Sequence, residues 1–141
     1  MNIDNHKIKV ISLKRREDRR KKFSETFKDY KFEFVDALDG QLYKMTSIDE
    51  KLIRGNDYEK YKIHIPSLVC ANKMHLRLLE ECSCDTVPYV IFEDDTELLK
   101  PIDFSFEEIC NKNLDAFWLC PGHPSILCYI VWPSGAKILL D

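Results

Sequence analysis

The segment Tyr89-Val90-Ile91-Phe92-Glu93-Asp94-Asp95 constrains the fold more than any other part of the chain. Its first four residues are apolar and prone to β-structure, so they predict a strand that ends where three consecutive carboxylates begin. Because side chains alternate along an extended backbone, we expect Glu93 and Asp95 to point one way and Asp94 the other. Two carboxylates then share one side at the carboxyl edge of a sheet, where open α/β folds bind ligands.

The acid triplet has two interpretations. Three adjacent carboxylates repel one another, and a divalent cation relieves this repulsion because hard cations take oxygen ligands. The alternative is a solvated loop that begins where the strand ends. The abrupt change from apolar to acidic residues favours the cation site, as does the second apolar patch at Leu98 and Leu99, which Pro101 follows closely. We therefore predict Glu93 and Asp95 as ligands of a metal ion, with Asp94 nearby.

Strand and helix patterns alternate along the chain, and this alternation predicts an α/β fold with a mainly parallel sheet and flanking helices. A weakly patterned connection with one short helix spans Gln41–Ile65. The predicted strands are Ile8–Leu13, Phe32–Ala37, Tyr89–Phe92, Ala116–Cys120 and Ile126–Trp132, and the predicted helices are Arg16–Asp29, one that starts at Pro66, Phe106–Asn111 and Ser134–Leu140.

Length and composition predict one domain, residues 1–141, with an ordinary core. The net charge of −3 gives no general attraction to nucleic acid or to an anionic membrane. We find no signal peptide and no segment long enough to span a membrane. The six cysteines form no CxxC pair, which argues against a zinc site and favours thiols in a reducing compartment. We therefore expect a cytoplasmic protein.

A basic block occupies residues 14–22. It either holds phosphate or forms the exposed face of a helix. For Arg19, Arg20, Lys21 and Lys22 the two interpretations are equal. Arg15 and Arg16 stand at the exit of the first strand, so phosphate is favoured there.

Three further residues are weighed individually. His75 lies on an apolar helical stripe, so a core histidine is favoured over a catalytic one. Asp115 precedes a strand and is interpreted as a cap or turn residue. His123 follows Pro121-Gly122 and is expected to face the edge of an active site.

Five segments of the chain, taken in order, carry a family pattern. They are the strand and Arg-rich helix at Val10–Arg20, the Phe34–Gly40 strand with its Asp-Gly turn, the helix around Met74-His75-Leu76, the acidic motif Ile91–Asp95, and the late strand and Gly-Ala helix at Tyr129–Leu140. Together they resemble glycosyltransferase family 25, the lipooligosaccharide and collagen galactosyltransferase type. Met74 stands where that family has the serine of a Ser-His helix.

The resemblance implies a GT-A-like (Rossmann-like) fold and a nucleotide-sugar donor, commonly UDP-galactose or UDP-glucose. It also implies Mn²⁺ or Mg²⁺ as cofactor and transfer to a saccharide or protein acceptor with inversion at the sugar carbon. The metal would be held by Glu93 and Asp95, and catalytic roles fall to Asp95 and, second to it, His75. The donor-binding residues expected on this basis are Ser12, Leu13, Arg15, Arg16, Asp39, Gly40 and Asp94.

The chain departs from the family pattern at two places. Only Pro121–Ser125 separates the last two predicted strands, and the chain stops at Asp141. We therefore expect a short member without the usual C-terminal part, for which a partner chain could supply the missing segment. No catalytic base is assigned. Two other interpretations stay open: an inactive nucleotide-sugar or metal-binding module that acts with a partner, and a metal-dependent phosphohydrolase.

Overall fold

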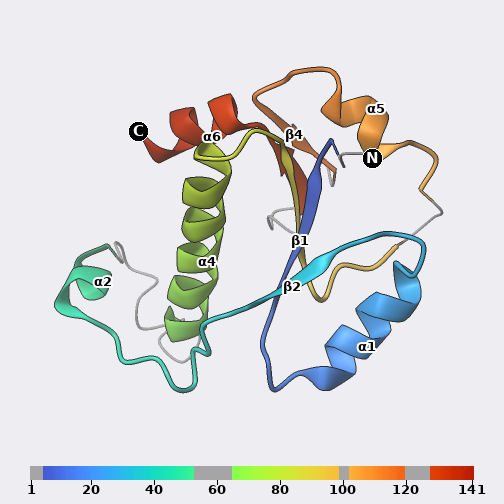
Figure 1. Cartoon of the computed structure of the whole chain (residues 1–141). Helices are drawn as coiled ribbons and strands as arrows, with labels where there is room; N and C mark the ends of the chain where they lie inside the picture. The colour runs from blue at the N-terminus through green and yellow to red at the C-terminus, as the bar shows by residue number, and fades with distance from the viewer. Residues whose placement is uncertain (1–4, 53–64, 99–101, 120–127) are drawn as a thin grey trace.

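The fold is built on a five-stranded sheet with the strand order β2-β1-β3-β5-β4 (Figure 1). The computed structural model describes residues 5–52, 65–98, 102–119 and 128–141. None of the helices in these ranges is long and apolar enough to cross a membrane. The elements, in chain order, are β1 (Lys7–Ser12), α1 (Glu17–Thr26), β2 (Glu33–Asp36), α2 (Ser47–Leu52), α4 (Ile65–Ser83), β3 (Tyr89–Glu93), α5 (Phe106–Cys110), β4 (Ala116–Trp118), β5 (Cys128–Val131) and α6 (Pro133–Leu140).

The sheet is mixed. β1 pairs in parallel with β2 and β3, whereas β5 pairs antiparallel with β3 and β4. The predicted α/β architecture with flanking helices is confirmed, and the parallel part of the sheet is the half formed by β2, β1 and β3. A strand has the same side-chain period whichever way it runs, so the pattern alone did not reveal the direction of β5. Since β4 and β3 are both antiparallel to β5, the carboxyl ends of β1, β2, β3 and β4 share one edge.

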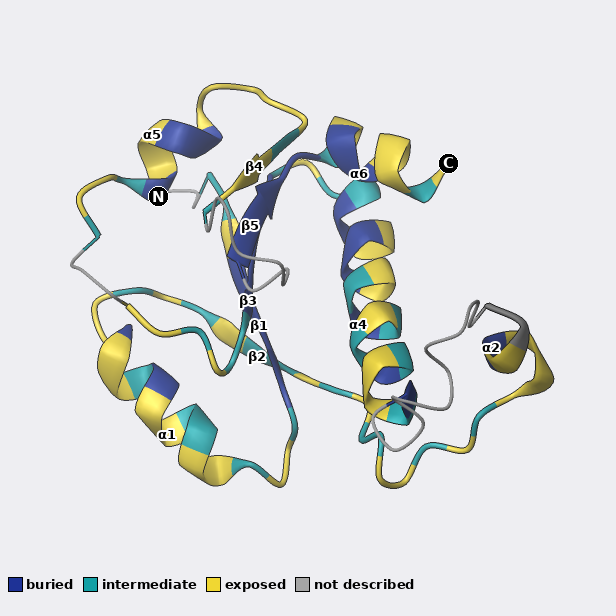
Figure 2. Cartoon of the chain, turned by 180° about the vertical axis from the view of Figure 1, so that it is seen from behind, coloured by how far each residue is buried: buried dark blue, intermediate teal, exposed yellow. Residues whose placement is uncertain are grey.

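One face of the sheet is covered by α1 and α5 (Figure 2). Phe23 of α1 and Phe27, which caps the helix, lie four residues apart and stack with ring centroids 4.3 Å apart. Both rings contact Phe92 of β3, and Val10 and Val90 complete this part of the core. The i and i+4 spacing of the two rings thus puts them on the side of the first helix that faces the sheet.

The opposite face is covered by α4 and α6 (Figure 2). Met74 and Leu78 of α4 pack here with Ile11 of β1, Ile91 of β3 and Tyr129 of β5. Along β3, therefore, Phe92 faces the α1 layer and Ile91 faces the α4 layer. By the same alternation, the last residue of the strand is directed to the α4 side.

Every element predicted within the described residues is present, and no end is shifted by more than three residues. Asp115, interpreted as a cap or turn residue, lies at a bend directly before β4. Its carbonyl accepts from the Trp132 N–H at 3.1 Å and its carboxylate from the Ser134 hydroxyl at 3.3 Å. His123 lies outside the described residues.

Candidate functional site

β3 ends at Glu93, and the two following acids leave the strand. The Asp94 N–H still donates to the carbonyl of Ile11 at 3.1 Å, but the Thr96 N–H donates back to the carbonyl of Glu93 at 3.1 Å and closes a turn. Strand alternation thus orients Glu93 and Asp94 and no longer governs Asp95. The expectation that Glu93 and Asp95 share one side assumed an extended backbone through Asp95, which the turn removes.

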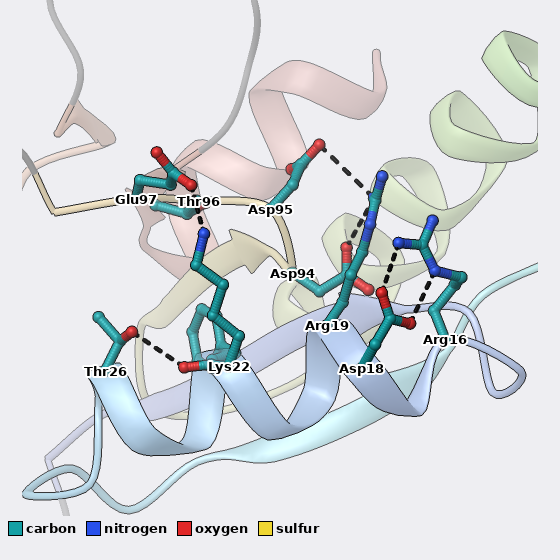
Figure 3. Close-up of a pocket in the computed structure, with 10 residues that line it drawn as sticks. Arg16, Asp18, Arg19, Lys22, Thr26, Asp94, Asp95, Thr96 and Glu97 are labelled. Atoms are coloured by element: carbon teal, nitrogen blue, oxygen red, sulfur yellow. Dashed lines mark hydrogen bonds and ion pairs between the residues drawn. The ribbon is translucent and has the colours of Figure 1, made fainter.

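Asp94 is held between the end of β1 and the first turns of α1 (Figure 3). Its Oδ2 accepts from the Ser12 hydroxyl at 2.8 Å, and the Arg19 Nη1 donates to Oδ1 at 3.2 Å. Arg20 secures Ser12 from the other side, because its Nε donates to the hydroxyl at 3.1 Å and its Nη2 to the carbonyl at 3.0 Å. The side chain of Asp94 is only 8% exposed. The predicted donor-binding residues Ser12 and Asp94 therefore meet, with two guanidinium groups beside them.

Asp95 is the most exposed of the three acids. Its side chain is 48% exposed, and its Oδ2 lies 3.7 Å from the Arg19 Nη1. Partial burial raises the pKa of Asp95, the negative charges of Glu93 and Asp94 raise it further, and Arg19 opposes both effects. A cation brought beside Asp95 would therefore stabilise its ionised form.

Glu93 turns towards α4, where it meets His75. The imidazole Nε2 lies 3.0 Å from the Glu93 Oε1, and Nδ1 lies 3.0 Å from the Tyr129 hydroxyl on β5. Both ring nitrogens of His75 are thus hydrogen-bonded, as expected for the favoured interpretation of a core histidine. One of these bonds also links His75 to the acid triplet. Burial and the nearby negative charge of Glu93 raise the pKa of Tyr129, so its hydroxyl stays protonated at neutral pH and can donate to Nδ1.

The acid triplet offers carboxylate oxygens of the kind that hard cations bind, but it does not form a complete metal site within the described residues. Within the part of the chain that the structure describes, no group of three or more His, Cys, Asp or Glu side chains is arranged to hold one. Asp94 is already engaged by Ser12 and Arg19, which leaves Glu93 and Asp95. Partial burial and, after it, the negative charge of Glu93 raise the pKa of Asp95. Hard cations take such oxygen ligands and fill their further positions with substrate phosphates.

The other predicted donor-binding residues surround the same edge. Arg15 pairs with Asp39, its Nε donating to Oδ2 at 2.5 Å, and this pair lowers the pKa of Asp39. Arg16 pairs with Asp18 on its own helix at 2.7 Å and holds the pKa of Asp18 at about 2. Arg15 and Arg16 thus already form ion pairs with neighbouring carboxylates, so a phosphate would have to compete with Asp39 and Asp18 for these guanidinium groups.

Two of these predicted residues have a clear structural role. Gly40 lies against the first turn of α4, since a Cβ there would come within 2.6 Å of the Ser67 Cα. The carbonyl of Leu13 accepts from the Arg16 N–H at 2.9 Å and so opens α1. These contacts explain the presence of Gly40 and Leu13 at the exits of β2 and β1 without a ligand.

A cavity of about 290 Å³ lies between α1 and the turn after β3 (Figure 3). Asp94, Asp95 and Arg19 are among the residues that line it, and Arg19 reaches both acids. Its lining carries three cations against four carboxylates, so the cavity has no net positive charge of its own. The full lining is Arg16, Asp18, Arg19, Lys22, Phe23, Thr26, Asp94, Asp95, Thr96 and Glu97.

The sequence did not single out Tyr129, and it left Arg19 and Arg20 undecided. Helical spacing puts Arg19 and Arg20 one turn before Phe23, next to the buried stripe, which is a weak signal that they lie near the sheet. Nothing in the local pattern pairs Tyr129 with His75, because the two residues are 54 positions apart.

Comparison with known families gives one match over most of the chain. The model of glycosyltransferase family 25 (LPS biosynthesis protein) matches residues 5–120, which is most of the chain. The chain belongs to glycosyltransferase family 25. No curated protein sequence matches it significantly.

The match places this family 25 chain among the glycosyltransferases. It contains the acid triplet, His75 and the Arg-rich helix, so four of the five segments that suggested the family lie inside it. The fifth, at Tyr129–Leu140, lies beyond the matched range.

Proposed function

We propose that this glycosyltransferase moves a hexose from a nucleotide diphosphate sugar, UDP-galactose or UDP-glucose, to a saccharide or protein acceptor with inversion at the sugar carbon. The observation that carries the proposal is that Ser12 and Arg19 both bind Asp94, which lines the cavity. The carboxyl ends of the adjacent parallel strands β1 and β3 form this place, and such edges are where α/β folds bind nucleotides.

Arg19 is the chain's own group for the donor diphosphate. It lies 3.2 Å from Asp94 and 3.7 Å from Asp95, so its position is set before substrate arrives. A cation that is already oriented stabilises the charge that develops on a leaving diphosphate without reorganising. Asp94 positions Arg19 by accepting its hydrogen bond. Ser12 in turn bonds both Asp94 and Arg20, and so holds the end of β1 against the turn after β3.

Glu93 and Asp95 are the residues that would hold Mn²⁺ or Mg²⁺ together with donor phosphate oxygens. When bound, the metal supplies Lewis-acid stabilisation of the departing diphosphate. We assign His75 the role of orienting Glu93, because both of its ring nitrogens are already hydrogen-bonded. An outer partner that fixes a carboxylate in this way is typical of metal sites.

Donor hydrolysis tests the proposal without knowledge of the acceptor. The chain is incubated with UDP-galactose or UDP-glucose and Mn²⁺, and released UDP is measured. We expect metal-dependent release that Asp95→Ala abolishes and that the matched variant Asp103→Ala, which removes an exposed carboxylate outside the cavity lining, leaves unchanged.

Other outcomes identify the alternatives. Saturable Mn²⁺-dependent binding of UDP-hexose with no release of UDP would support an inactive donor-binding module. Turnover of p-nitrophenyl phosphate without turnover of UDP-hexose would favour a phosphohydrolase. Full activity of Asp95→Ala would remove Asp95 from the site.

A further inference from the structure

Trp118 is a large aromatic side chain left half exposed at the edge of the sheet. It is the last residue of β4, and 48% of its surface is accessible. Its backbone pairs with Tyr129 of β5, and the two rings lie with their centroids 5.1 Å apart. Tyr129 itself is buried. The indole is therefore positioned on one side by a buried ring and open on the other.

A chain of side-chain contacts connects Trp118 to the acid triplet through Tyr129 and His75. Tyr129 contacts His75 through its hydroxyl at 3.0 Å, and His75 contacts Glu93 at 3.0 Å. Directly paired residues of antiparallel strands lie on the same face, so Trp118 and Tyr129 both lie on the α4 side of the sheet, as Glu93 does. β4 runs in the same direction as β3, so Trp118 is also near the edge where the acids lie.

The chemistry of this surface suits a sugar ring. One face of a pyranose is made of C–H groups, which pack against the electron-rich face of an indole, while its hydroxyl groups remain at the rim. A lipid chain or an apolar peptide would fit less well, because it would strip water from the carboxylate of Glu93, whose side chain is 30% exposed, without replacing the hydrogen bonds of that water.

The position of Trp118 distinguishes the acceptor from the donor. The cavity with Arg19 lies on the α1 side of β3, and Trp118 lies on the α4 side, beyond β5. The acids at the end of β3 stand between them. We propose that Trp118 is a stacking platform for a pyranose ring of the acceptor saccharide, which reaches the acids from the side opposite to the donor diphosphate. This inference rests on the proposed transferase function.

Intrinsic fluorescence gives a direct test, because the only other tryptophan is buried. Trp132 is 3% exposed and its Nε1–H donates to the carbonyl of Cys110 at 3.0 Å, so its emission is shielded from ligands. The probes are methyl β-D-galactopyranoside and methyl β-D-glucopyranoside, added without donor or metal. We expect at least one of them to change the emission saturably, and we expect Trp118→Phe to abolish this change.

Kinetics with the same glycosides as acceptors distinguishes a loss of acceptor binding from a general effect of the substitution on the fold. With UDP-galactose and Mn²⁺, Trp118→Ala should raise the acceptor KM about tenfold, the loss typical of one aromatic stack. Donor hydrolysis without acceptor should stay unchanged, and Trp118→Phe should recover most of the acceptor KM. The matched control is Phe117→Ala, since Phe117 is the preceding residue of β4, is 39% exposed, and pairs with Ile130 on the other face.

The outcomes separate this inference from the proposed function. Equal acceptor KM values for Trp118→Ala, Phe117→Ala and the unmodified chain would overturn the platform, as would a rise in donor KM alone. If the unmodified chain hydrolyses no UDP-hexose, the proposed function fails, and the fluorescence titration still decides whether Trp118 binds a pyranose. Absence of any saturable fluorescence change would overturn the inference by itself.

Discussion

The hydroxyl of Ser12 donates a 2.8 Å hydrogen bond to the carboxylate of Asp94, and this contact ties the end of β1 to the turn after β3. Ser12 is buried at 1% exposure, so neither group exchanges this bond readily for water. The same hydroxyl accepts from Arg20, which links β1, β3 and α1 at one point. The edge of the sheet that forms the cavity is thereby fixed in shape.

Ser12→Ala should destabilise the fold. It removes a hydrogen bond to a carboxylate and takes this acceptor from the Nε of the partly buried Arg20, at a cost of about 1.5–3 kcal/mol. Urea unfolding at neutral pH measures the change. The control is Ser134→Ala, because Ser134 is exposed and its 3.3 Å bond to Asp115 should be worth less than about 0.5 kcal/mol. Equal midpoints for the two variants would contradict the prediction.

Asp95→Asn should stabilise the metal-free fold while it impairs donor hydrolysis. The raised pKa of Asp95 means that its ionised form is disfavoured by partial burial and by Glu93, and an amide removes that cost. The gain is below about 1 kcal/mol because the side chain is half exposed. Thermal unfolding in chelator should show an increase in Tm.

Glu97→Gln is the opposite case and serves as the control for Asp95→Asn. Lys22 lowers the pKa of Glu97 through an ion pair at 2.5 Å, so its neutralisation should leave Tm unchanged or reduce it. An increase for Glu97→Gln as large as that for Asp95→Asn would show that the effect is not specific to the acid triplet.

Asp49 should make stability depend on acid pH. Its buried carboxylate accepts from the Thr46 N–H at 2.9 Å and the Tyr43 hydroxyl at 2.7 Å, and it pairs with Lys73 at 3.1 Å. These partners, led by the Thr46 N–H, lower the pKa of Asp49 in the folded state. A depressed folded pKa gives stability that is present above the unfolded value of about 3.9 and is lost as the pH falls below it.

Asp49→Asn tests that assignment. The variant should unfold at lower urea than the unmodified chain at pH 7, and the difference should shrink as the pH falls below the unfolded value. Glu50→Gln changes the next residue, which is exposed, and should show no such convergence. A difference that is constant with pH would show that packing, and not the charge of Asp49, is responsible.

Gly135→Ala should destabilise the chain although alanine favours helices. A Cβ at Gly135 in α6 would lie 1.9 Å from the carbonyl oxygen of Asp115, which is itself held by the Trp132 N–H. Relief of this clash requires backbone movement and should cost about 1–3 kcal/mol, more than the roughly 1 kcal/mol of helix propensity gained. Urea unfolding against Lys137→Ala, an exposed position of α6, measures it, and a stabilised Gly135→Ala would refute the close approach.

The local sequence pattern was sufficient to predict the strands and helices and to place the acid triplet at the end of a strand. A strand made of a four-residue apolar run is expected to end where three carboxylates follow, and β3 does end at Glu93. The spacing of Phe23 and Phe27 was enough to orient α1, because i and i+4 side chains share one face of any helix. Family membership could also be inferred from short segments in the right order.

Partners distant in the sequence were decided only by the tertiary structure. Ser12 and Asp94 are 82 residues apart and His75 and Tyr129 are 54 apart, and their contacts depend on strand order and register, which have no local signature. The same holds for the antiparallel direction of β5, for the turn that frees Asp95 from strand alternation, and for the half-exposed ring of Trp118. The sequence by itself determined which side chains carry chemistry and at which end of a strand they lie. The fold decided which of them meet, because pairing is a property of the assembled sheet.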